Sequence, residues 1–402
     1  MLDVLIAGAG IGGLALAGGL VRDGLAVRVL EAAPGLREGG AAVTIYSNGA
    51  AALAALGAPL PDGIGGRIDR LEARDERDRP IFRFDLTVLH RRTGFPVLTV
   101  PRNRLLRHLA DGLPDGTIRY GHPVASAGAG KARAKAAPSD QRTNAEGLPN
   151  TNAEGGSNAN AEGGPERAAL VGVDGTVHRA DVVVGADGAR SAVRGGPPAR
   201  EVGWTTWQGL TPVLPEIAAG TTARLYVGPA GLVGLMPAGN GLLQWWFDST
   251  EAEPDLRARF AAYPAPVRTL LASYADTDLG CFPHVVHEVP DAWGAGRTTL
   301  LGDAAHAFPP SQAQGANQAL EDAWLLRAAI QAGGTAAHLR AYERTRARRV
   351  RRVSRMAARE TTNKPVNPLT RRLASVIPPA LGGQANLRLI RGFSSVLSGD
   401  RL

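Results

Sequence analysis

Three glycines near the start of the chain carry the clearest chemical signal in the sequence. They form the pattern Gly8-x-Gly10-x-x-Gly13, directly after an apolar run at residues 3–7 and at the opening of a small-residue helix. In a dinucleotide-binding loop the first glycine permits a tight turn, the second lets the backbone approach a pyrophosphate, and the third allows helix and strand to pack closely. Glu31 ends the next apolar run, where a carboxylate accepts from ribose hydroxyls. The segment predicts a βαβ unit with phosphates at the helix N-terminus.

Two later segments bear on which dinucleotide is bound and for which reaction. Residues 182–186 form an apolar run that predicts a buried strand, and this run leads directly into Asp187. Residues 298–301 form a second such run, which leads into the segment Gly-Asp-Ala-Ala-His-Ala-Phe-Pro-Pro at 302–310. A helix is predicted to follow from about residue 315 to residue 330.

Together with the glycine pattern, these segments resemble the fingerprints of the single-component FAD-dependent aromatic monooxygenases, the group that includes p-hydroxybenzoate and salicylate hydroxylases. The resemblance covers most of residues 1–345. It implies FAD as cofactor, NADH or NADPH as transient reductant, and insertion of one oxygen atom from O2 into an aromatic or polycyclic small molecule via a flavin hydroperoxide. The sequence has no second unit in which a strand, a Gly-x-Gly-x-x-Gly pattern and a helix follow one another. This absence fits transient nicotinamide binding in a shared groove.

The resemblance also implies which residues contact FAD. Glu31 would hold the adenosine ribose, Arg37 would lie near the adenosine end, and Arg102 would reach the phosphate and flavin region. Asp187 would shape the cleft shared with NADH or NADPH, and Asp303 would bind the ribityl or pyrophosphate portion. The predicted cofactor residues are Gly8, Gly10, Gly13, Glu31, Arg37, Arg102, Asp187, Asp303, Pro310, Gly315, Ala316 and Asn317.

The loop beside the flavin has features of its own. The helix that begins near Gly315 would aim its N-terminus at the pyrimidine side of the flavin, where negative charge develops on reduction. Pro310 and the proline before it remove backbone donors and stiffen the loop. Two positions depart from the family pattern: Gln312-Ala313 stands where relatives usually have at least one glycine, and Gln208 stands where many have arginine. The first bears on the shape of the loop and the second on the charge of the substrate.

No residue is assigned to catalysis, and four residues are candidates for the substrate pocket, with ordinary core packing as the alternative for each. Trp245 and Trp246 face opposite sides of a strand, so one is expected to line the substrate cavity and the other to pack in the sheet. No metal site is predicted, because His284 and His287 also face opposite sides of a strand, and His306 is predicted to be structural. The predicted substrate residues are Tyr46, Tyr226, Met236 and Trp246.

The predicted strands and helices that must position these residues indicate an α/β fold. It consists of a glutathione-reductase-like, Rossmann-type FAD-binding domain with an inserted β-sheet-rich substrate domain. Residues 130–167 contain three Asn-Ala-Glu-Gly repeats and little apolar material, so they predict a disordered expansion of a hairpin turn. The domain boundaries are 1–66, 100–194 and 291–362 for the FAD-binding domain, 67–99 and 195–290 for the substrate domain, and 363–402 for a C-terminal tail.

The charge of the 402-residue chain is concentrated in one segment. Residues 340–372 contain twelve basic and two acidic residues, a local net charge of +10, whereas the whole chain carries +8. The basicity therefore does not favour a nucleic-acid partner, and a solvated helix face is the simpler interpretation. The single cysteine, Cys281, the absence of ~18 consecutive apolar residues and the N-terminus without a basic leader predict a cytoplasmic protein without a membrane span.

Several alternatives stay open at this point. One is a flavin-dependent halogenase or another flavoprotein oxidase; a halogenase is disfavoured because no lysine precedes Lys131 to serve in its active site. A non-enzymatic alternative is an FAD-binding protein that uses the basic helix at 340–359 for membrane or polyanion contact. The sequence leaves undecided the substrate, the choice among hydroxylation, epoxidation and Baeyer-Villiger oxidation, NADH against NADPH, and the oligomeric state.

Overall fold

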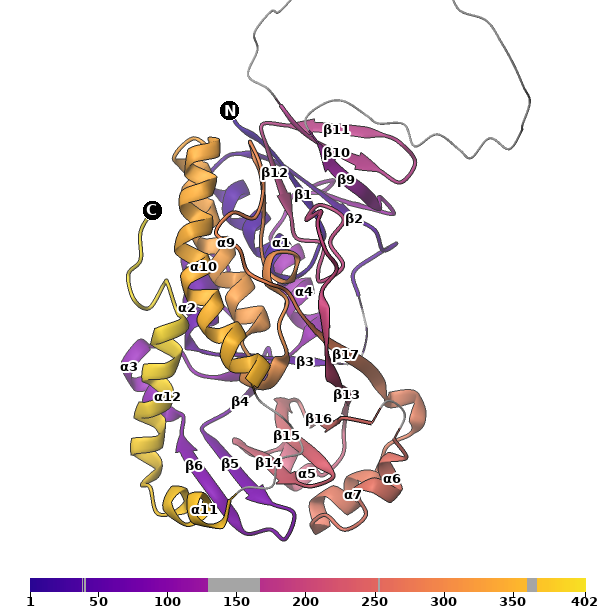
Figure 1. Ribbon diagram of the computed structural model, residues 1–402, viewed down its shortest axis with the longest axis vertical. Coiled ribbons are helices and arrows are strands. Elements are labelled where there is room, and N and C mark those ends of the chain that lie inside the picture. Colours follow the sequence, from indigo (N-terminus) through magenta and orange to yellow (C-terminus); the bar gives the residue numbers. More distant parts are fainter. Residues whose placement is uncertain (38, 40, 129–166, 252–253, 360–366) are drawn as a thin grey trace, which may run out of the picture.

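The computed structural model describes residues 1–37, 39, 41–128, 167–251, 254–359 and 367–402. Its architecture is two β-sheet layers, one above the other in Figure 1, joined by a small third sheet. The predicted hairpin insert falls almost wholly outside the described residues. The strands on either side of it, β9 (Val124–Gly128) and β10 (Ala168–Gly172), pair antiparallel, as the hairpin prediction requires.

A five-stranded parallel sheet forms the upper layer. Apolar side chains of β1 and β12 are fully buried, as expected for a parallel sheet covered on both faces. The chain leaves β1 toward β2 on one side and later returns to β12 on the other, so the carboxyl end of β1 is the topological switch point where open α/β sheets bind ligands. The strand order is β18 (Thr298–Leu300), β12 (Val182–Gly185), β1 (Asp3–Ala7), β2 (Ala26–Glu31) and β8 (Ile118–Tyr120).

Helices cover one face of this sheet, and β9, β10 and β11 (Val177–Ala180) cover the other. The helices pack closely because small residues line their contacts: a Cβ on Gly12 would lie 3.1 Å from the Cβ of Ala319. The helix predicted at about 315–330 agrees with α9 to within one residue, and the basic helix at 340–359 is the larger part of α10. The helices are α1 (Ile11–Arg22), α4 (Arg102–Ala110), α9 (Gly315–Gln331) and α10 (Ala336–Arg359).

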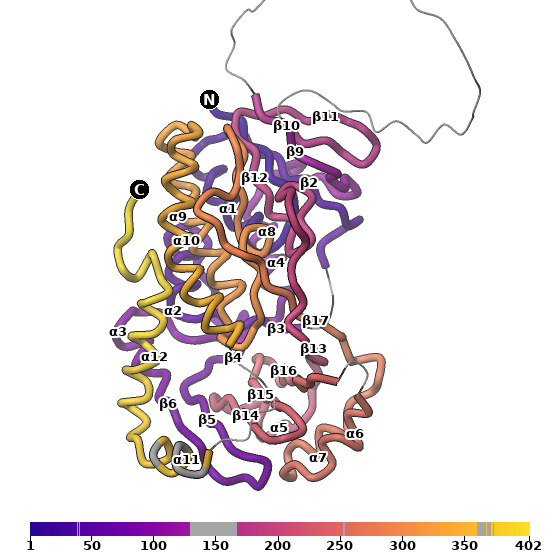
Figure 2. The backbone as a smooth tube through the Cα atoms, viewed as in Figure 1, coloured from indigo at the N-terminus to yellow at the C-terminus, as the bar shows by residue number. Residues whose placement is uncertain are grey.

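A seven-stranded mixed sheet forms the lower layer, and the long strands β13 and β17 run between it and the upper layer (Figure 2). Its outer face packs against α5 (Pro215–Ala218), α6 (Leu256–Arg259) and α7 (Ala265–Ser273) in one apolar core. The strand order is β17 (Gly280–Val286), β13 (Arg200–Thr211), β16 (Leu242–Ser249), β15 (Gly231–Gly239), β14 (Thr222–Gly228), β5 (Arg70–Asp75) and β6 (Pro80–Asp85).

A small sheet and two helices lie between the layers, and we call the lower-layer face turned toward them the inner face. A mixed apolar cluster joins residues of the inner face to residues of the upper layer, among them Met236 and Tyr46. The connecting elements are β3 (Ala42–Ile45), β7 (Leu98–Pro101), β4 (Gly66–Arg67), α2 (Ser47–Ala55) and α3 (Thr87–Thr93).

The C-terminal residues, predicted to be a tail, contain two helices, α11 (Pro368–Ser375) and α12 (Pro379–Phe393). Leu387, Ile390 and Phe393 of α12 are buried, and the helix packs against β6 and α3 at the edge of the lower layer. Among the described residues, no helix is long and apolar enough to cross a membrane. The α/β class, with a parallel sheet and a separate β-rich layer, is confirmed.

Candidate active site

The three glycines of the first motif lie at the switch point, and each is glycine for a different reason. A Cβ on Gly8 would lie 2.4 Å from the carbonyl oxygen of Ala186, and a Cβ on Gly13 would lie 2.2 Å from the carbonyl oxygen of Gly8. A Cβ on Gly10 would meet no described atom closer than 4.0 Å. The packing of the protein itself therefore requires the first and third glycines, whereas the second borders an open cradle at the N-terminus of α1, where an anion is stabilised.

Glu31 fixes the shape of this loop. One carboxylate oxygen accepts the backbone N–H of Ala9 at 2.7 Å, and the other accepts the backbone N–H of Ala33 at 2.9 Å. Each carboxylate oxygen has a second lone pair, so two further hydroxyl groups could still donate to Glu31. The residue both holds the loop and retains the capacity to bind a ribose.

Two arginines form a cationic site near the cleft. The guanidinium Nε of Arg102 is buried and has no hydrogen-bond partner among the described residues. Burial and the nearby charge of Arg37 lower the pKa of Arg102, which the charge of Asp303 partly offsets. Two cations beside one carboxylate leave a net positive charge, which a pyrophosphate would neutralise with charge-assisted hydrogen bonds.

Asp303 begins the short helix α8 (Asp303–His306) directly after β18. Its side chain reaches solvent although protein surrounds it on most sides, and this desolvation raises the pKa of its carboxyl. Such an environment is typical of the wall of a cleft that a ligand fills. The charge of Arg102 lowers the pKa of Asp303, which shows that the two residues lie near each other.

A fully buried cluster of charged side chains holds the segment that contains Gly302 and α8. Asp322 accepts the backbone N–H of Gly302 at 2.8 Å, His306 Nε2 lies 2.6 Å from the same carboxylate, and Arg346 Nε donates to it at 2.6 Å. These contacts, led by the charges of His306 and Arg346, hold the pKa of Asp322 at about 2 despite its burial. We call His306, Glu321, Asp322 and Arg346 the Asp322 cluster. His306 is structural, as predicted.

The loop at 302–314 ends in an unusual backbone conformation. Ala313 has φ of 48° and therefore adopts the left-handed conformation that glycine would supply, so the sequence departure leaves the turn intact. The Asn317 side chain donates to the Ala313 carbonyl at 2.8 Å and to the Thr44 carbonyl at 2.9 Å, and accepts the Tyr46 N–H at 2.9 Å. Asn317 thus ties the loop to β3, and its side chain is fully committed to the protein.

The other predicted cofactor residues divide into two groups. Asp187 uses its carboxylate within its own turn, where it accepts from the Ser191 hydroxyl at 2.5 Å and from the Ala192 N–H at 2.7 Å. It therefore shapes the cleft rather than reaching into it. Pro310 is exposed, and Gly315 and Ala316 are half-buried at the start of α9, so a ligand could reach all three.

The adjacent tryptophans of β16 lie on opposite faces, and each ring covers a glycine of a neighbouring strand. A Cβ on Gly209 would lie 2.2 Å from the ring of Trp245, which is fully buried in the outer core. A Cβ on Gly234 would lie 2.1 Å from the ring of Trp246, which lies half-buried on the inner face. The two glycines determine where the two rings lie.

Three of the four predicted substrate residues are brought together. Tyr46, Met236 and Ala313 of the 302–314 loop share one apolar cluster, and Trp246 lies on the same inner face as Met236. Tyr46 is buried, which raises the pKa of its phenol to about 12, and no described residue hydrogen-bonds to its hydroxyl. Tyr226 is not brought to this site, because it points into the outer core on the other face of the sheet.

Comparisons with known proteins agree with this geometry. Residues 131–357 match the family model described as an FAD binding domain. The chain is 30% identical over 341 residues to the aurachin C monooxygenase/isomerase of Stigmatella aurantiaca, covering 81% of this chain and 79% of that protein. The chain belongs to the FAD-binding domain family. It is an FAD-dependent monooxygenase.

Further relatives favour the monooxygenase over the halogenase and oxidase alternatives. The chain is 31% identical over 375 residues to the 3-amino-4-hydroxybenzoate 2-monooxygenase PtnB3 of Streptomyces platensis, covering 88% of this chain and 86% of that protein. The structure of Klebsiella pneumoniae HpxO complexed with FAD and uric acid superposes with a TM-score of 0.74 at 26% identity, covering 99% of this chain and 95% of that chain. FAD is the cofactor, with NADH or NADPH as reductant.

Two sets of hydrogen-bonded polar side chains on the inner face of the monooxygenase were not predicted from the sequence. In the first, Thr206 hydrogen-bonds to Asp248 and lies 2.7 Å from His284 Nε2. In the second, Gln244 donates to Gln208 at 2.9 Å. Their members are 36 to 78 residues apart in the chain, so no local pattern could indicate them. The alternation of the strands, however, already places Gln208 and Thr206 on one face.

His284 lies in β17 beside Thr206, whereas His287 lies one residue beyond the end of that strand. No group of metal-ligating residues occurs in the described parts of the monooxygenase. Burial lowers the pKa of each imidazole to about 4; for His287 the charge of Arg194 contributes as well. The His287 backbone N–H donates to the Ala307 carbonyl at 2.8 Å. The end of β17 is thereby attached to the 302–314 loop.

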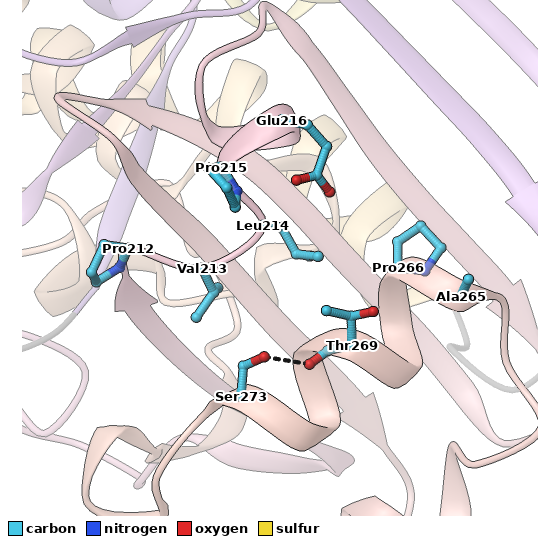
Figure 3. Close-up of a pocket in the computed structure, with 9 residues that line it drawn as sticks. All are labelled: Pro212, Val213, Leu214, Pro215, Glu216, Ala265, Pro266, Thr269 and Ser273. Atoms are coloured by element: carbon cyan, nitrogen blue, oxygen red, sulfur yellow. Dashed lines mark hydrogen bonds between the residues drawn. The ribbon is translucent and has the colours of Figure 1, made fainter.

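Two hollows lie away from the predicted cofactor residues. One, of about 590 Å³, opens between α5 and α7 behind the outer core, and its polar contact is the hydrogen bond from the Ser273 hydroxyl to the Thr269 carbonyl (Figure 3). The other, of about 410 Å³, lies between the 59–65 loop and α3. Neither is lined by a residue of the three fingerprints, so neither is part of the candidate active site.

Proposed function

We propose that this monooxygenase inserts one oxygen atom from O2 into an aromatic or polycyclic small molecule bound between Tyr46 and the inner face of the lower sheet. The observation that carries the proposal is the convergence of Tyr46, Met236 and Trp246 with the 302–314 loop, one element of the flavin cleft. Aromatic and sulfur side chains form the flat apolar surface that an aromatic ring requires. The relatives that act on uric acid and on 3-amino-4-hydroxybenzoate support a small aromatic substrate.

The residues of the cleft would divide the work of holding FAD. Gly10 and the N-terminus of α1 would take the pyrophosphate with Arg102 and Arg37, and Glu31 would accept from the adenosine ribose. Asp303 would accept from the ribityl chain, and the N-terminus of α9 would face the flavin ring. When bound, FAD supplies electron transfer from NADH or NADPH and activation of oxygen. The protein positions the substrate ring and excludes water around it.

The proposed domain division follows from the same assignment. The upper layer would bind FAD through residues 1–66, 100–194 and 291–362, and the lower layer would bind the substrate through residues 67–99 and 195–290. The bounds of the lower sheet, whose strands fall within 70–85 and 200–286, support this division.

The test is a substrate screen on the purified protein. A yellow protein that oxidises NADH or NADPH faster with a phenolic compound, and yields a product heavier by one oxygen atom, would support the proposal. A colourless protein that binds no FAD, or a flavoprotein whose NADH and NADPH oxidation no aromatic compound stimulates, would contradict it.

A further inference from the structure

Two glutamines on neighbouring strands of the inner face form a chain of hydrogen bonds that begins at β3, in the small sheet between the layers. The backbone N–H of Ala42, at the start of β3, donates to Gln244 Oε1 at 2.6 Å. Gln244 Nε2 then donates to Gln208 Oε1 at 2.9 Å. We call this chain of hydrogen bonds, from Ala42 through Gln244 to Gln208, the relay. Gln244 is buried and Gln208 is half-buried, so the relay runs from the interior toward an accessible space.

The chemistry of the groups determines the direction of the relay. A backbone N–H can only donate, so the Gln244 atom that faces Ala42 must be the oxygen. The other end of that amide is therefore the NH2 group, and the Gln208 atom that it faces must also be an oxygen. Both amides are therefore oriented by the Ala42 N–H. Gln208 is left with its NH2 group outward, and no described residue accepts from it.

The free donor lies on the surface assigned to the substrate. Gln208 pairs across the strands with Trp246, and Gln244 pairs with Met236, so all four share the inner face. One carboxylate on this face, that of Asp248, is buried and accepts a hydrogen bond from Thr206. At Gln208 a negatively charged substrate group would find only a neutral amide, whereas a neutral acceptor such as a carbonyl oxygen meets a fixed donor.

We infer that Gln208 determines specificity by donating to a neutral carbonyl oxygen on the aromatic substrate, and that Gln244 is the positioning residue that keeps the donor outward. The inference rests on the proposed function, because it places the substrate on the inner face. It narrows the substrate class to aromatic amides, lactams and ketones, in preference to aromatic carboxylates.

The test measures dissociation constants from the change in flavin absorbance of the holoenzyme at pH 7.5. The probes are salicylamide, salicylate and phenol, with the bicyclic set 3-hydroxy-2-naphthamide, 3-hydroxy-2-naphthoate and 2-naphthol. Within each set the aromatic ring and its hydroxyl group are constant. The substituent beside the hydroxyl is a neutral carboxamide, a carboxylate anion or a hydrogen atom. The wild type should bind the amide of at least one set about tenfold more tightly than the other two members, the effect of one hydrogen bond.

Substitutions separate the donor from its positioning residue. Gln208→Leu should reduce the affinity for the amide to that for the plain phenol. Gln208→Arg should shift the preference to the carboxylate. The Gln244→Glu side chain can still accept from the Ala42 N–H but, as a carboxylate, offers Gln208 no donor. The Gln208 amide should then turn its NH2 group toward this carboxylate. The variant should therefore lose the preference for the aromatic amide although Gln208 is unchanged. The exposed Gln384→Leu on α12 is the matched control and should leave all ratios unchanged.

The outcomes distinguish the two claims. A wild-type preference for the carboxylate or the plain phenol, or an unchanged amide preference in Gln208→Leu at normal flavin content, overturns the inference and leaves the proposed function standing. An unchanged preference in Gln244→Glu overturns the positioning role. If none of the six probes perturbs the flavin, both the inference and the aromatic substrate proposal fail.

Discussion

At the scale of single residues, identical residue types do different work according to what surrounds them. Gly8, Gly10 and Gly13 belong to one motif, but the backbone of the protein occupies the space beside the first and third, and only the space beside the second is open. A motif alone does not make this distinction. The structure therefore predicts that substitutions at the three positions fail in different ways.

The first prediction concerns Gly10 and Gly13. Gly10→Val should fold, because its side chain meets no described atom closely, but should abolish FAD binding by occupying the pyrophosphate cradle. Gly13→Ala should instead destabilise the protein by roughly 1–3 kcal/mol, because its Cβ would contact the Gly8 carbonyl. Flavin absorbance and urea unfolding of both variants measure the two effects. Wild-type flavin content in Gly10→Val would refute the role given to Gly10.

The second prediction uses the two tryptophan and glycine pairs. Gly209→Ala forces a Cβ against Trp245, which is buried and fixed by a hydrogen bond to Thr211 at 2.8 Å, so the free energy of unfolding should fall by roughly 1–3 kcal/mol. Gly234→Ala forces a Cβ against the half-buried Trp246, whose ring has room to move. It should alter substrate-stimulated oxidation of NADH or NADPH more than stability. Equal losses of stability in both variants would contradict this assignment of the faces.

At the scale of elements, the arginines of α10 divide into two sets. Five of them are exposed, as a solvated helix face requires, whereas others attach the helix to its surroundings; the exposed ones are Arg344, Arg348, Arg352, Arg355 and Arg359. Arg346 is fully buried in the Asp322 cluster, and Arg340, Arg349 and Arg351 pair with Glu343, Asp400 and Asp291. Glu321 of the same cluster accepts the backbone N–H of Ser395 at 2.6 Å, so the C-terminal segment is bound to α9 and α10.

The third prediction concerns Arg346. Arg346→Met leaves the carboxylates of Glu321 and Asp322 buried without their cation, so the free energy of unfolding should fall by about 3–5 kcal/mol. FAD affinity should fall as well, because Asp322 also holds the Gly302 N–H at the cleft. Arg348→Met, at an exposed position of the same helix, is the control. Equal stability of the two variants in urea unfolding would contradict the supporting role of the cluster.

The sequence predicted the elements whose information is local. The βαβ unit, the helices at 315–331 and 336–359 and the opposite faces of Trp245 and Trp246 follow from periodicity and motif spacing. The relay from Ala42 to Gln208 could not be predicted, because it joins residues 202 positions apart and depends on how the two layers meet. The helix α12 could have been found, since Leu387, Ile390 and Phe393 recur every three residues, a spacing typical of a buried helix face.

At the scale of the whole molecule, the two layers are held together at a few defined contacts. The relay from Ala42 and the hydrogen bond between Thr44 and Met236 at 3.4 Å join β3 to the lower sheet. At the other edge, the end of β17 joins the 302–314 loop through His287. Because the proposed cofactor site lies in one layer and the proposed substrate surface in the other, these contacts would determine the distance between flavin and substrate.

His284 in β17 and His287 directly after it make the junction between the layers sensitive to acid, which is the fourth prediction. The folded protein holds the pKa of His284 and of His287 at about 4, whereas an unfolded histidine titrates near ~6.5. Protons therefore bind the unfolded chain more readily than the folded chain between these values. The stability that the neutral imidazoles contribute is fully present above pH ~6.5 and is lost as the pH falls toward 4, by on the order of a few kcal/mol.

Urea unfolding at pH 7.5, 6.5, 5.5 and 4.5 measures this loss. His284→Gln keeps a donor for the Thr206 hydroxyl but cannot take up a proton, so its free energy of unfolding should fall less steeply between pH 6.5 and 4.5 than that of the wild type. His122→Gln, at an exposed position beside β8, should retain the wild-type slope. Parallel slopes for the wild type and His284→Gln would show that acid acts elsewhere. A flatter slope together with retained flavin content would locate part of the acid sensitivity at His284, beside Thr206 on the inner face.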